Sequence, residues 1–349
     1  MKIIQLIQKP QLRGAEIFAC QLSNHLMDQG HEVVVVSIFK GDSQLPFKGE
    51  TIHLNRPLSK RFVDFQGWKK FNSIIKEFNP DIIQANAADT LKFSANSKLF
   101  FGWQIPIIFR NANKMGDFID NSVKLRLNKF YLSKVSEVIS VSNECRNDFI
   151  STFTWPSNRI ETIEIGVENK SIGEMPEDLS EIFNKGKVLL NIGSFVPEKN
   201  QSELLDVFFN IKKESPDLQL ILIGLGPKIE EIKNKANKLG IIESVHFLGY
   251  RTDVLEILHY SNIFVLPSLI EGLPAVILES MYCDTPVVAY NVGGISEVVI
   301  SSKTGWLVEK GDTVEFQNSI KGIIEDGGKA QAIVKNANDL IRQKFMNVM

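Results

Sequence analysis

The sequence predicts an α/β protein with two doubly wound, Rossmann-like domains. Short apolar segments alternate with amphipathic segments along the whole chain, as expected of repeated βαβ units with parallel strands. Residues 33–36 are four consecutive valines, which is typical of a strand covered by helices on both faces. The length of 349 residues is enough for two domains of ordinary size.

The first half of the chain predicts one complete domain, residues 1–168. We expect its strands at 2–7, 32–38, 50–54, 81–85, 106–110, 137–141 and 160–165. Helices are expected at 14–29, at 62–78 and around 120–134. Aromatic residues at helical spacing within 62–78 favour a core-facing stripe, and contact with a membrane or an acceptor is the alternative for the basic residues among them.

The second half repeats the scheme after a linker at 169–186, which is polar and broken by Gly173 and Pro176. Strands are expected at 187–192, 218–223, 244–248, 263–266, 286–290 and 306–308, and helices at 200–214, 228–239, 252–260 and 274–283. We assign residues 187–330 to this domain and 331–349 to a C-terminal helix that could pack back toward the first domain. Because open α/β sheets bind ligands at the carboxyl ends of their strands, the two domains are expected to face each other across a cleft.

Composition excludes several classes of protein. The hydrophobic content of 44% and charged content of 23% are ordinary for a globular protein, and the net charge of −2 implies no bulk attraction to nucleic acid. Basic residues outnumber acidic ones in the first half, which suits an anionic acceptor or a membrane surface but also simple scattered lysines. Three widely spaced cysteines (Cys20, Cys145, Cys283) form no metal-binding spacing and no disulfide framework. We expect no signal peptide, no bilayer-spanning segment and a cytoplasmic location.

The stretch after the strand at 263–266 carries the strongest chemical signal. Residues 267–282 read PSLIEGLPAVILESMY. Pro274 suits a first helical position, so the free N–H groups of Leu273 to Val276 would form an anion site at a helix N-terminus. Glu271 in the loop and Glu279 on the helix would flank that site. The pattern favours a polar, phosphorylated ligand.

Further motifs follow this stretch: the apolar run at 286–289, then Gly293, Gly294 and Glu297. With them, the sequence resembles glycosyltransferase family 4, the retaining nucleotide-sugar enzymes of the GT-B architecture. The resemblance is strongest from about residue 189 to residue 308. It implies that Glu279 binds the ribose hydroxyls of the donor and Glu271 the sugar hydroxyls. It also places Gly272, Leu273, Pro274 and Ala275 around the oxygens of the donor sugar or phosphates.

Two other segments of the second half resemble donor-binding parts of the family. In residues 191–200, Gly193 would permit a tight turn, and Ser194 stands where the family usually has an arginine. Lys199 is then the main cation expected to stabilise charge on the leaving diphosphate, and a solvated lysine at a helix start is the alternative. Tyr250 and Arg251 end a segment that would lie against the nucleobase.

The first domain offers fewer candidates. Arg13 and Gly14 precede a helix, where Gly14 would let a backbone N–H approach the donor diphosphate; a plain turn is the alternative. Arg110 and Asn111 end a strand just before Ala112, where many family members place a histidine that contacts the transferred sugar. We therefore expect Arg110 and Asn111, together with Arg13, on the sugar or acceptor side.

These observations predict a retaining, hexosyltransferase-type enzyme. It would move a sugar from a nucleoside diphosphate sugar to a saccharide or lipid-linked acceptor in cell-surface polysaccharide or glycolipid synthesis. We expect no cofactor and no metal, since the sequence has no D-x-D element, and peripheral contact with the inner face of the membrane stays open. The alternatives are a nucleotide-sugar epimerase and a non-catalytic nucleotide-sugar-binding subunit. With glutamates at 271 and 279 and a lysine at 199, the sequence argues against the latter.

Overall fold

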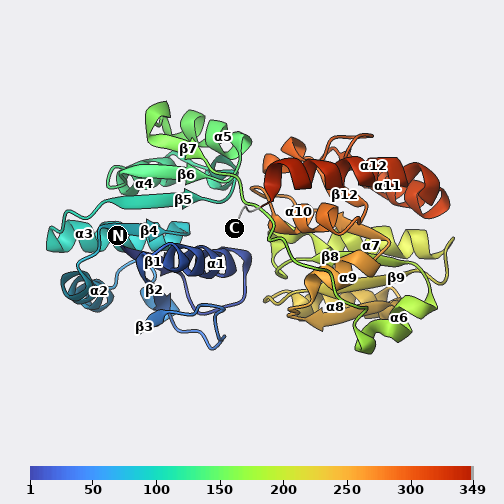
Figure 1. Cartoon of the computed structure of the whole chain (residues 1–349), viewed down its shortest axis with the longest axis horizontal. Coiled ribbons are helices and arrows are strands. Elements are labelled where there is room, and N and C mark those ends of the chain that lie inside the picture. Colours follow the sequence, from blue (N-terminus) through green and yellow to red (C-terminus); the bar gives the residue numbers. More distant parts are fainter. Residues whose placement is uncertain (347–349) are drawn as a thin grey trace. The chain divides into compact units, whose positions relative to one another are not determined.

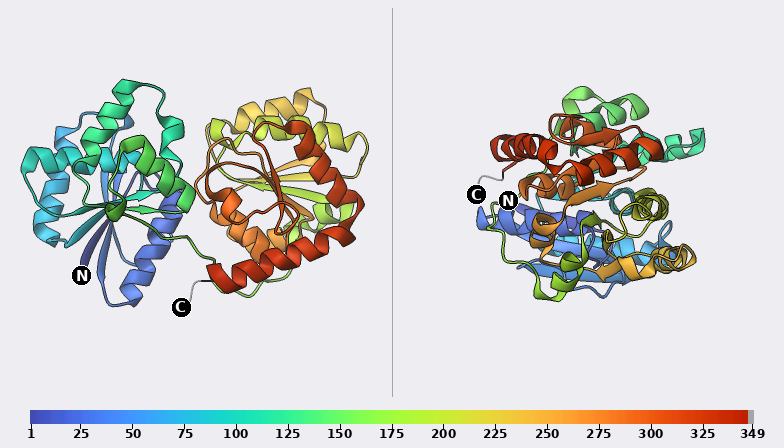
Figure 2. Two further views of the ribbon diagram at one scale, coloured as in Figure 1. Left: turned by 90° about the horizontal axis from the view of Figure 1, so that it is seen from above. Right: turned by 90° about the vertical axis from the view of Figure 1, so that its right-hand side faces the viewer.

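The computed structural model describes residues 1–346 and divides the chain into two compact units, Met1–Ile163 and Glu164–Met349 (Figure 1). Each unit is a parallel sheet with helices on both faces, which confirms the predicted fold class (Figure 2). The division lies earlier in the chain than the expected boundary at 168. The reason is that residues just after it pair with the end of the chain: the N–H of Val167 donates to the carbonyl of Phe345 at 2.8 Å.

The first unit is built on seven parallel strands in the order β3-β2-β1-β4-β5-β6-β7. These are β1 (Lys2–Ile7), β2 (Glu32–Phe39), β3 (Glu50–Arg56), β4 (Ile82–Ala85), β5 (Ile107–Asn111), β6 (Glu137–Ser140) and β7 (Ile160–Thr162). All but β7 agree with the sequence prediction to within two residues. The predicted extension of β7 to 165 is wrong: the strand ends at Thr162, and the second unit begins at Glu164.

Five helices cover this sheet: α1 (Gly14–Asp28), α2 (Phe65–Phe78), α3 (Ala88–Phe101), α4 (Ser122–Leu132) and α5 (Asn143–Phe153). The sequence prediction missed α3 and α5. The buried face of α3 includes Asp89, Thr90, Ser94 and Ser97, so its sequence lacks a continuous apolar stripe. A large core cluster packs α2, α3 and α5 against one face of the sheet, and a smaller one packs Ala19 of α1 against the other.

The aromatic segment at 62–78 divides between core and surface. Asp64 caps α2 by accepting from the N–H of Gly67, so the helix begins at Phe65 rather than at residue 62. Trp68 and Phe71 are buried in the core, whereas Phe62 is 68% exposed. The expected core role is therefore confirmed for Trp68 and Phe71 and wrong for Phe62 and for Phe65, which begins the helix and is 47% exposed.

The second unit has six parallel strands in the order β10-β9-β8-β11-β12-β13. They are β8 (Val188–Ile192), β9 (Gln219–Ile223), β10 (Val245–Gly249), β11 (Ile263–Leu266), β12 (Val287–Tyr290) and β13 (Trp306–Val308). The main helices are α7 (Gln201–Lys212), α8 (Ile229–Lys238), α9 (Val254–Tyr260), α10 (Ala275–Tyr282), α11 (Thr313–Glu325) and α12 (Gly327–Leu340). The strands and the first four of these helices were predicted at nearly these positions.

Both ends of the second unit carry more helix than predicted. The expected linker contains a short helix, α6 (Ser180–Lys185). The C-terminal helix begins at Gly327 rather than 331 and continues as one π-turn, Ile341–Phe345; residues 347–349 of the prediction lie outside the described residues. It is anchored within its own unit, since the side-chain amide of Asn338 donates to the carbonyls of Met281 and Tyr282.

Candidate active site

The strand order of the second sheet places a ligand site between β8 and β11. These strands are neighbours, but the strands that follow each of them continue toward opposite edges of the sheet. The loops leaving the two strands therefore diverge and open a crevice at their carboxyl ends, where open α/β sheets bind ligands. The loop after β8 runs from Gly193 to Lys199, and the loop after β11 runs from Pro267 to Pro274. Both are predicted site segments.

An ion pair joins the two loops. Lys199 contacts the carboxylate of Glu271, which is buried, while 21% of the Lys199 side chain is exposed. Lys199 ends a 3₁₀ turn, Pro197–Lys199, and Asn200 follows in the left-handed region with φ 54°. The N–H of Leu269 donates to the carbonyl of Glu198 at 2.8 Å and ties the loops together by their backbones. The two residues assigned to catalysis from sequence thus lie in direct contact.

Gly293 holds the Glu271 loop in place. It has φ 57°, and a Cβ added there would lie 2.2 Å from the carbonyl oxygen of Glu271. The next residue, Gly294, donates its N–H to the carbonyl of Gly272 at 2.6 Å. Only glycine permits this approach of two backbones. The Gly-Gly motif recognised in the sequence therefore packs directly against the backbone of the loop that carries Glu271.

The start of α10 offers unpaired N–H groups beside this ion pair. Pro274 is the N-cap, with ψ 127°, and not the first helical residue that the sequence analysis expected. Within residues 1–346, the backbone N–H groups of Leu273, Ala275 and Val276 donate to no carbonyl. Such groups at a helix N-terminus attract anions. Together with Lys199 they can bind the oxygens of a phosphorylated ligand.

Glu279, on the second turn of α10, has a carboxylate without a donor. It is half-buried, and no described residue hydrogen-bonds to it. Burial raises the pKa of its carboxyl to about 7, with Lys170 lowering the pKa and Glu168 raising it. Glu279 is thus suited to accept hydrogen bonds from ligand hydroxyls.

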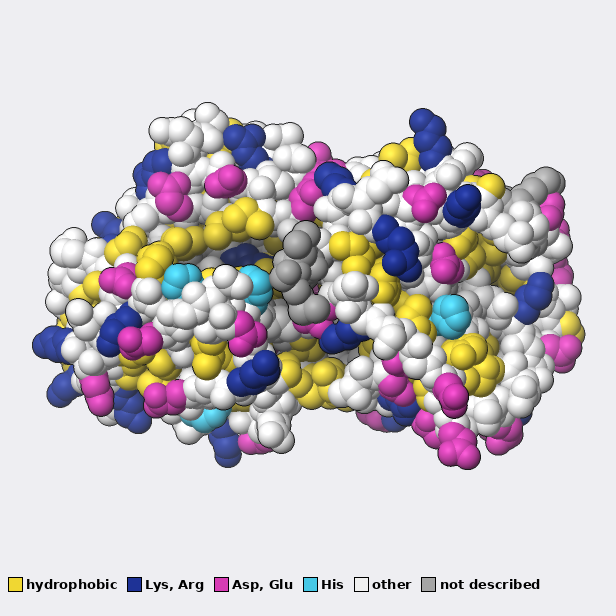
Figure 3. Space-filling view, viewed as in Figure 1, with side chains coloured by type: hydrophobic (Ala, Val, Ile, Leu, Met, Phe, Trp, Pro, Cys, Tyr) yellow, Lys and Arg dark blue, Asp and Glu magenta, His cyan; other side chains and the backbone are white. Residues whose placement is uncertain are grey.

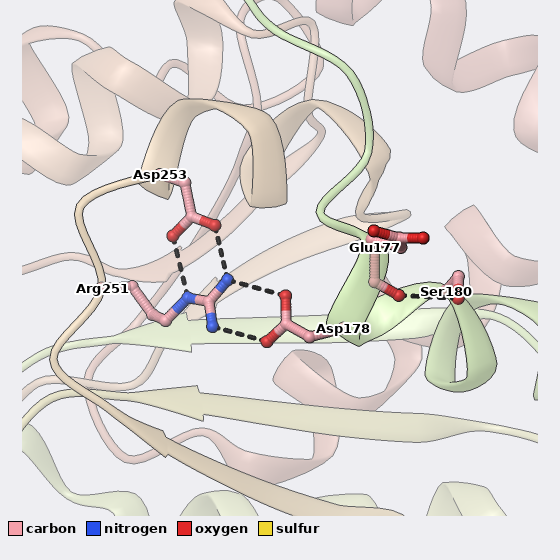
Figure 4. A network of polar contacts seen from close by, with 5 residues as sticks. All are labelled: Glu177, Asp178, Ser180, Arg251 and Asp253. Carbon is pink, nitrogen blue, oxygen red and sulfur yellow. Dashed lines mark hydrogen bonds and ion pairs between the residues drawn. The ribbon is translucent and has the colours of Figure 1, made fainter.

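Arg251 does not fit its expected role in donor binding. Its guanidinium bonds Asp253 through Nε at 2.8 Å and Asp178 through Nη1 at 2.7 Å, with further bonds to both carboxylates (Figure 4). The hydrogen bonds that it donates to Asp253 and then to Asp178 raise its pKa. Two carboxylates neutralise the guanidinium, which fastens the start of α9 to the segment before α6. Tyr250 beside it is partly exposed and has no polar contact in the described structure.

The candidates in the first unit occupy distinct environments. Arg13 is the N-cap of α1 and Gly14 its first residue; a Cβ added to Gly14 would meet no atom within 4 Å. Asn111 is fully buried, and its amide donates to the Ser140 hydroxyl at 2.9 Å and to the Cys145 carbonyl at 3.1 Å. These bonds tie β5 to β6 and α5. Room for a ligand therefore exists at Gly14, whereas the amide nitrogen of Asn111 is used within the fold and its Oδ1 is buried without a hydrogen-bond partner.

Arg110 is the other charged candidate of the first unit, and it is 7% exposed. Its guanidinium lies 3.9 Å from the centroid of the Phe18 ring. A cation–π contact of this kind contributes about 0.5–2 kcal/mol. Burying an ion without a counter-charge costs several kcal/mol, so the ring offsets only part of that cost.

Sequence analysis missed two polar groups of the second-unit site. The side-chain nitrogen of Asn200 and the hydroxyl of Ser268 are buried without hydrogen-bond partners, and they follow β8 and β11 respectively. Asn200 tolerates its left-handed backbone better than most residues, which is the one signal that its sequence carried. Ser268 was visible only as part of a turn. Buried groups of this kind require a ligand or water as partner.

The described residues contain no group of three or more His, Cys, Asp or Glu side chains arranged to hold a metal ion. Among the described helices, none combines the length and apolar character needed to cross a bilayer.

Two family models match the chain. The model described as Glycosyltransferase Family 4 matches residues 12–170, and the model described as Glycosyl transferases group 1 matches residues 177–340. The chain is a group 1 glycosyltransferase. The second match spans the Lys199–Glu271 pair and Glu279. This glycosyltransferase accordingly has the GT-B fold, with a parallel-sheet domain in each half.

Individual relatives agree with this assignment. The glycosyltransferase is 27% identical over 314 residues to a glycosyltransferase of Haemophilus influenzae, covering 89% of this chain and 85% of that protein. It is 24% identical to the N-acetyl-alpha-D-glucosaminyl L-malate synthase of Bacillus anthracis, covering 96% and 91%. Among solved structures, HepE of Anabaena in complex with UDP-glucose matches with TM-score 0.82 at 24% identity, covering 99% of this chain and 96% of that one.

Proposed function

We propose that the enzyme transfers a sugar, with retention of configuration, from a nucleoside diphosphate sugar to an acceptor hydroxyl. The observation that carries this proposal is the Lys199–Glu271 ion pair beside the unpaired N–H groups at the start of α10. This arrangement combines a cation and oriented dipoles for a diphosphate with a carboxylate for sugar hydroxyls. HepE was solved with UDP-glucose, so UDP-sugars are the first donors to test.

The chemistry follows from these groups. The bond between the anomeric carbon and the diphosphate oxygen breaks, and a bond to the acceptor oxygen forms on the same face of the sugar. The acceptor proton passes to an oxygen of the departing diphosphate. Lys199 stabilises the charge that develops on that diphosphate, while Glu271 orients the sugar and Glu279 accepts hydrogen bonds from the ribose. The glycine-supported loop keeps these groups preorganised, so little reorganisation is needed during the reaction.

The proposed acceptor is a saccharide or lipid-linked saccharide in cell-surface polysaccharide or glycolipid synthesis. The proposed reaction needs no metal. Helix α4 supports contact with a membrane surface. Val123, Leu127 and Phe130 are exposed at helical spacing, and the helix carries Lys124, Arg126 and Lys129 without any acidic residue. An apolar stripe flanked by basic side chains suits the interface of an anionic bilayer. We therefore place the enzyme in the cytoplasm, peripheral to the membrane.

The variant Lys199→Ala tests this function after a thermal-shift screen has identified the donor. We expect turnover to fall on the order of 100-fold or more, comparable to the loss of one oxyanion donor. Affinity for the nucleoside diphosphate should fall as well. Lys321→Ala is the matched control, because Lys321 also pairs with a glutamate (Glu214) and is 21% exposed. EDTA should leave the rate unchanged.

The same assay separates the alternatives. Ser194 leaves the loop after β8 with one cation fewer than its family usually has, which favours a protein that binds the donor without catalysis. Donor binding without any transfer product would support that alternative. A new nucleotide sugar formed without an acceptor would instead support an epimerase. Parent-rate transfer by Lys199→Ala would place the phosphate site elsewhere.

A further inference from the structure

Buried polar side chains line one face of the first sheet. Gln5 of β1 pairs with Gln84 of β4, and Gln84 pairs with Ile108, two residues before Arg110 on β5. Because alternate residues of a strand point to the same side, Gln5, Gln84 and Arg110 share a face. The contact of Arg110 with Phe18 shows that this is the face covered by α1.

The amides on this face bond to one another but leave a donor unused. The amide nitrogen of Gln84 donates to Asn86 at 2.9 Å, and the amide nitrogen of Asn86 donates to Gln5 at 2.8 Å. The amide nitrogen of Gln5 is buried and has no acceptor. An unfilled donor in a buried position indicates that a hydrogen-bond acceptor belongs beside it.

Arg110 is the stronger signal. In residues 1–346 its guanidinium donates no hydrogen bond and makes no ion pair, and only the Phe18 ring contacts it as a partner. Burial lowers its pKa to about 10, so the group remains charged at neutral pH. Stacking on the ring compensates only part of the lost hydration. The described residues therefore supply no counter-ion for this charge.

Carboxylates at the starts of α1 and α3, the helices that follow β1 and β4, are already engaged. Glu16 of α1 accepts from the amide of Gln11 at 2.9 Å. Asp89, at the start of α3, accepts from Arg61 at 2.8 Å and from Gln8. Neither carboxylate contributes to the pKa of Arg110, which burial alone shifts. An external anion is thus the missing partner.

The surface provides an opening at this place. Figure 3 shows a hollow over the first unit, between the regions where Figure 1 labels β5 and α1, with a basic side chain in its depth. Arg110 is on β5, and its guanidinium contacts the ring of Phe18 on α1, so this contact joins the two elements on either side of the hollow. A small ligand group can enter there.

We propose that the first unit binds an oxyanion, a carboxylate or phosphate group of the acceptor, through an ion pair with Arg110. This rests on the proposed transferase function, because it makes the acceptor of that reaction an acid. The planar guanidinium can donate two parallel hydrogen bonds to such a group. The unfilled amide donor of Gln5 lies on the same face of the sheet.

A stability measurement on the full chain tests the site without requiring activity. Inorganic phosphate is the probe, added with UDP already saturating so that diphosphate sites are filled. Without phosphate, Arg110→Met should melt at the same temperature as the parent or higher, because it removes an unpaired buried charge. With phosphate, the melting temperature of the parent should rise and that of Arg110→Met should not. Arg126→Met, which removes an exposed arginine of the same unit, should respond like the parent.

If the guanidinium only stabilises the packing of α1, the melting temperatures should show the opposite pattern. Arg110→Met would then melt lower than the parent in both conditions, and phosphate would shift both proteins equally. That result would overturn the proposal. Arg110→Lys provides a second variant in case methionine disturbs folding: it keeps the charge but loses the paired hydrogen bonds, so its response to phosphate should be reduced rather than abolished.

A kinetic experiment decides whether the acceptor or the donor carries the oxyanion. Using the donor found by screening, kcat/KM is compared for a hexose, its 6-phosphate and the matching hexuronic acid. We expect an acidic acceptor to be preferred at least tenfold and Arg110→Gln to remove that preference with UDP affinity unchanged. A tenfold loss of UDP affinity would instead assign the oxyanion to the donor and overturn the acceptor assignment. If no donor is turned over but the phosphate response still depends on Arg110, the transferase proposal fails while the oxyanion site stands.

Discussion

Glu271 and Glu279 lie eight residues apart, yet their carboxylates have different surroundings. Glu271 is buried against Lys199, so removal of either partner leaves a charge unpaired. Glu279 has no cation in hydrogen-bond contact, and burial raises its pKa to about 7. Glu271 therefore has a cationic partner within the protein, whereas Glu279, with a raised pKa, depends on a ligand to supply hydrogen-bond donors.

The raised pKa of Glu279 predicts a pH dependence of donor binding. Ribose hydroxyls bind best to the charged carboxylate, so UDP affinity should rise from pH 6 to pH 8 in the parent. Titration calorimetry should show that Glu279→Gln loses this part of the pH dependence and about 1.5–3 kcal/mol of binding energy at pH 8. Because both proteins bind the same nucleotide, the titration of UDP itself cancels. Identical pH profiles would remove Glu279 from the ribose site.

The same group affects stability with a defined sign. Its pKa is raised from 4.5 to about 7 on folding. The stability it contributes is thus fully present below pH 4.5 and is lost as the pH rises through about 7. In the ligand-free protein, Glu279→Gln should flatten the fall in unfolding free energy across this interval. Denaturant titrations at several pH values measure the difference between the two proteins.

At the scale of elements, backbone contacts between loops position the site. The loops after β8, β11 and β12 come from strands that lie side by side, and they contact one another through main-chain groups. Gly293 approaches the carbonyl of Glu271 too closely for any side chain. The helix at 275–282 then presents its N–H groups to the same place. The loops converge because their strands are parallel neighbours and because Gly293 lets two loop backbones come into contact.

Gly293→Ala tests the loop contact. A Cβ 2.2 Å from the Glu271 carbonyl forces that loop to move, and the residue also has positive φ. We expect a loss of about 1–3 kcal/mol in stability and a marked fall in UDP affinity and turnover. Gly240→Ala is the control, because Gly240 has φ 70° and open space around it. Normal UDP binding by Gly293→Ala would show that the loop position does not matter for the donor.

At the scale of the whole molecule, the proposed membrane contact depends on the distribution of exposed apolar and basic residues. On α4, Leu127 is 43% exposed and lies between Val123 and Phe130 on one stripe. Basic residues near an anionic surface contribute about 1 kcal/mol each. The helix therefore has both contributions that peripheral binding needs.

Vesicle sedimentation measures this binding. The parent should bind vesicles containing phosphatidylglycerol more strongly than pure phosphatidylcholine, and added salt should weaken the binding. Leu127→Glu should reduce the bound fraction roughly tenfold, since it removes apolar area and adds a repelled charge. Val314→Glu alters an exposed apolar residue of the second unit and should bind like the parent. Equal binding by all three proteins would exclude α4 as the contact.

The sequence alone determined the fold class and nearly every strand, and it identified Lys199, Glu271 and Glu279 as candidate site residues. Strand and helix periodicity are local properties, and the glycosyltransferase motifs are contiguous, so both can be recognised without coordinates. Helix α3 was missed because it buries polar residues and therefore lacks the apolar periodicity by which a helix is recognised.

Only the tertiary structure decided how the charges are paired. Lys199 and Glu271 are 72 positions apart, and Asp178 meets Arg251 across 73. Chain folding alone brought Arg251 between two carboxylates while it left Arg110 buried with none. Long-range packing sets both burial and partners, and these two quantities determine what a charged side chain can do. The sequence proposed Arg251 for donor binding and Arg13 and Arg110 for the sugar or acceptor side. Desolvation without a counter-charge distinguishes Arg110 in the structure.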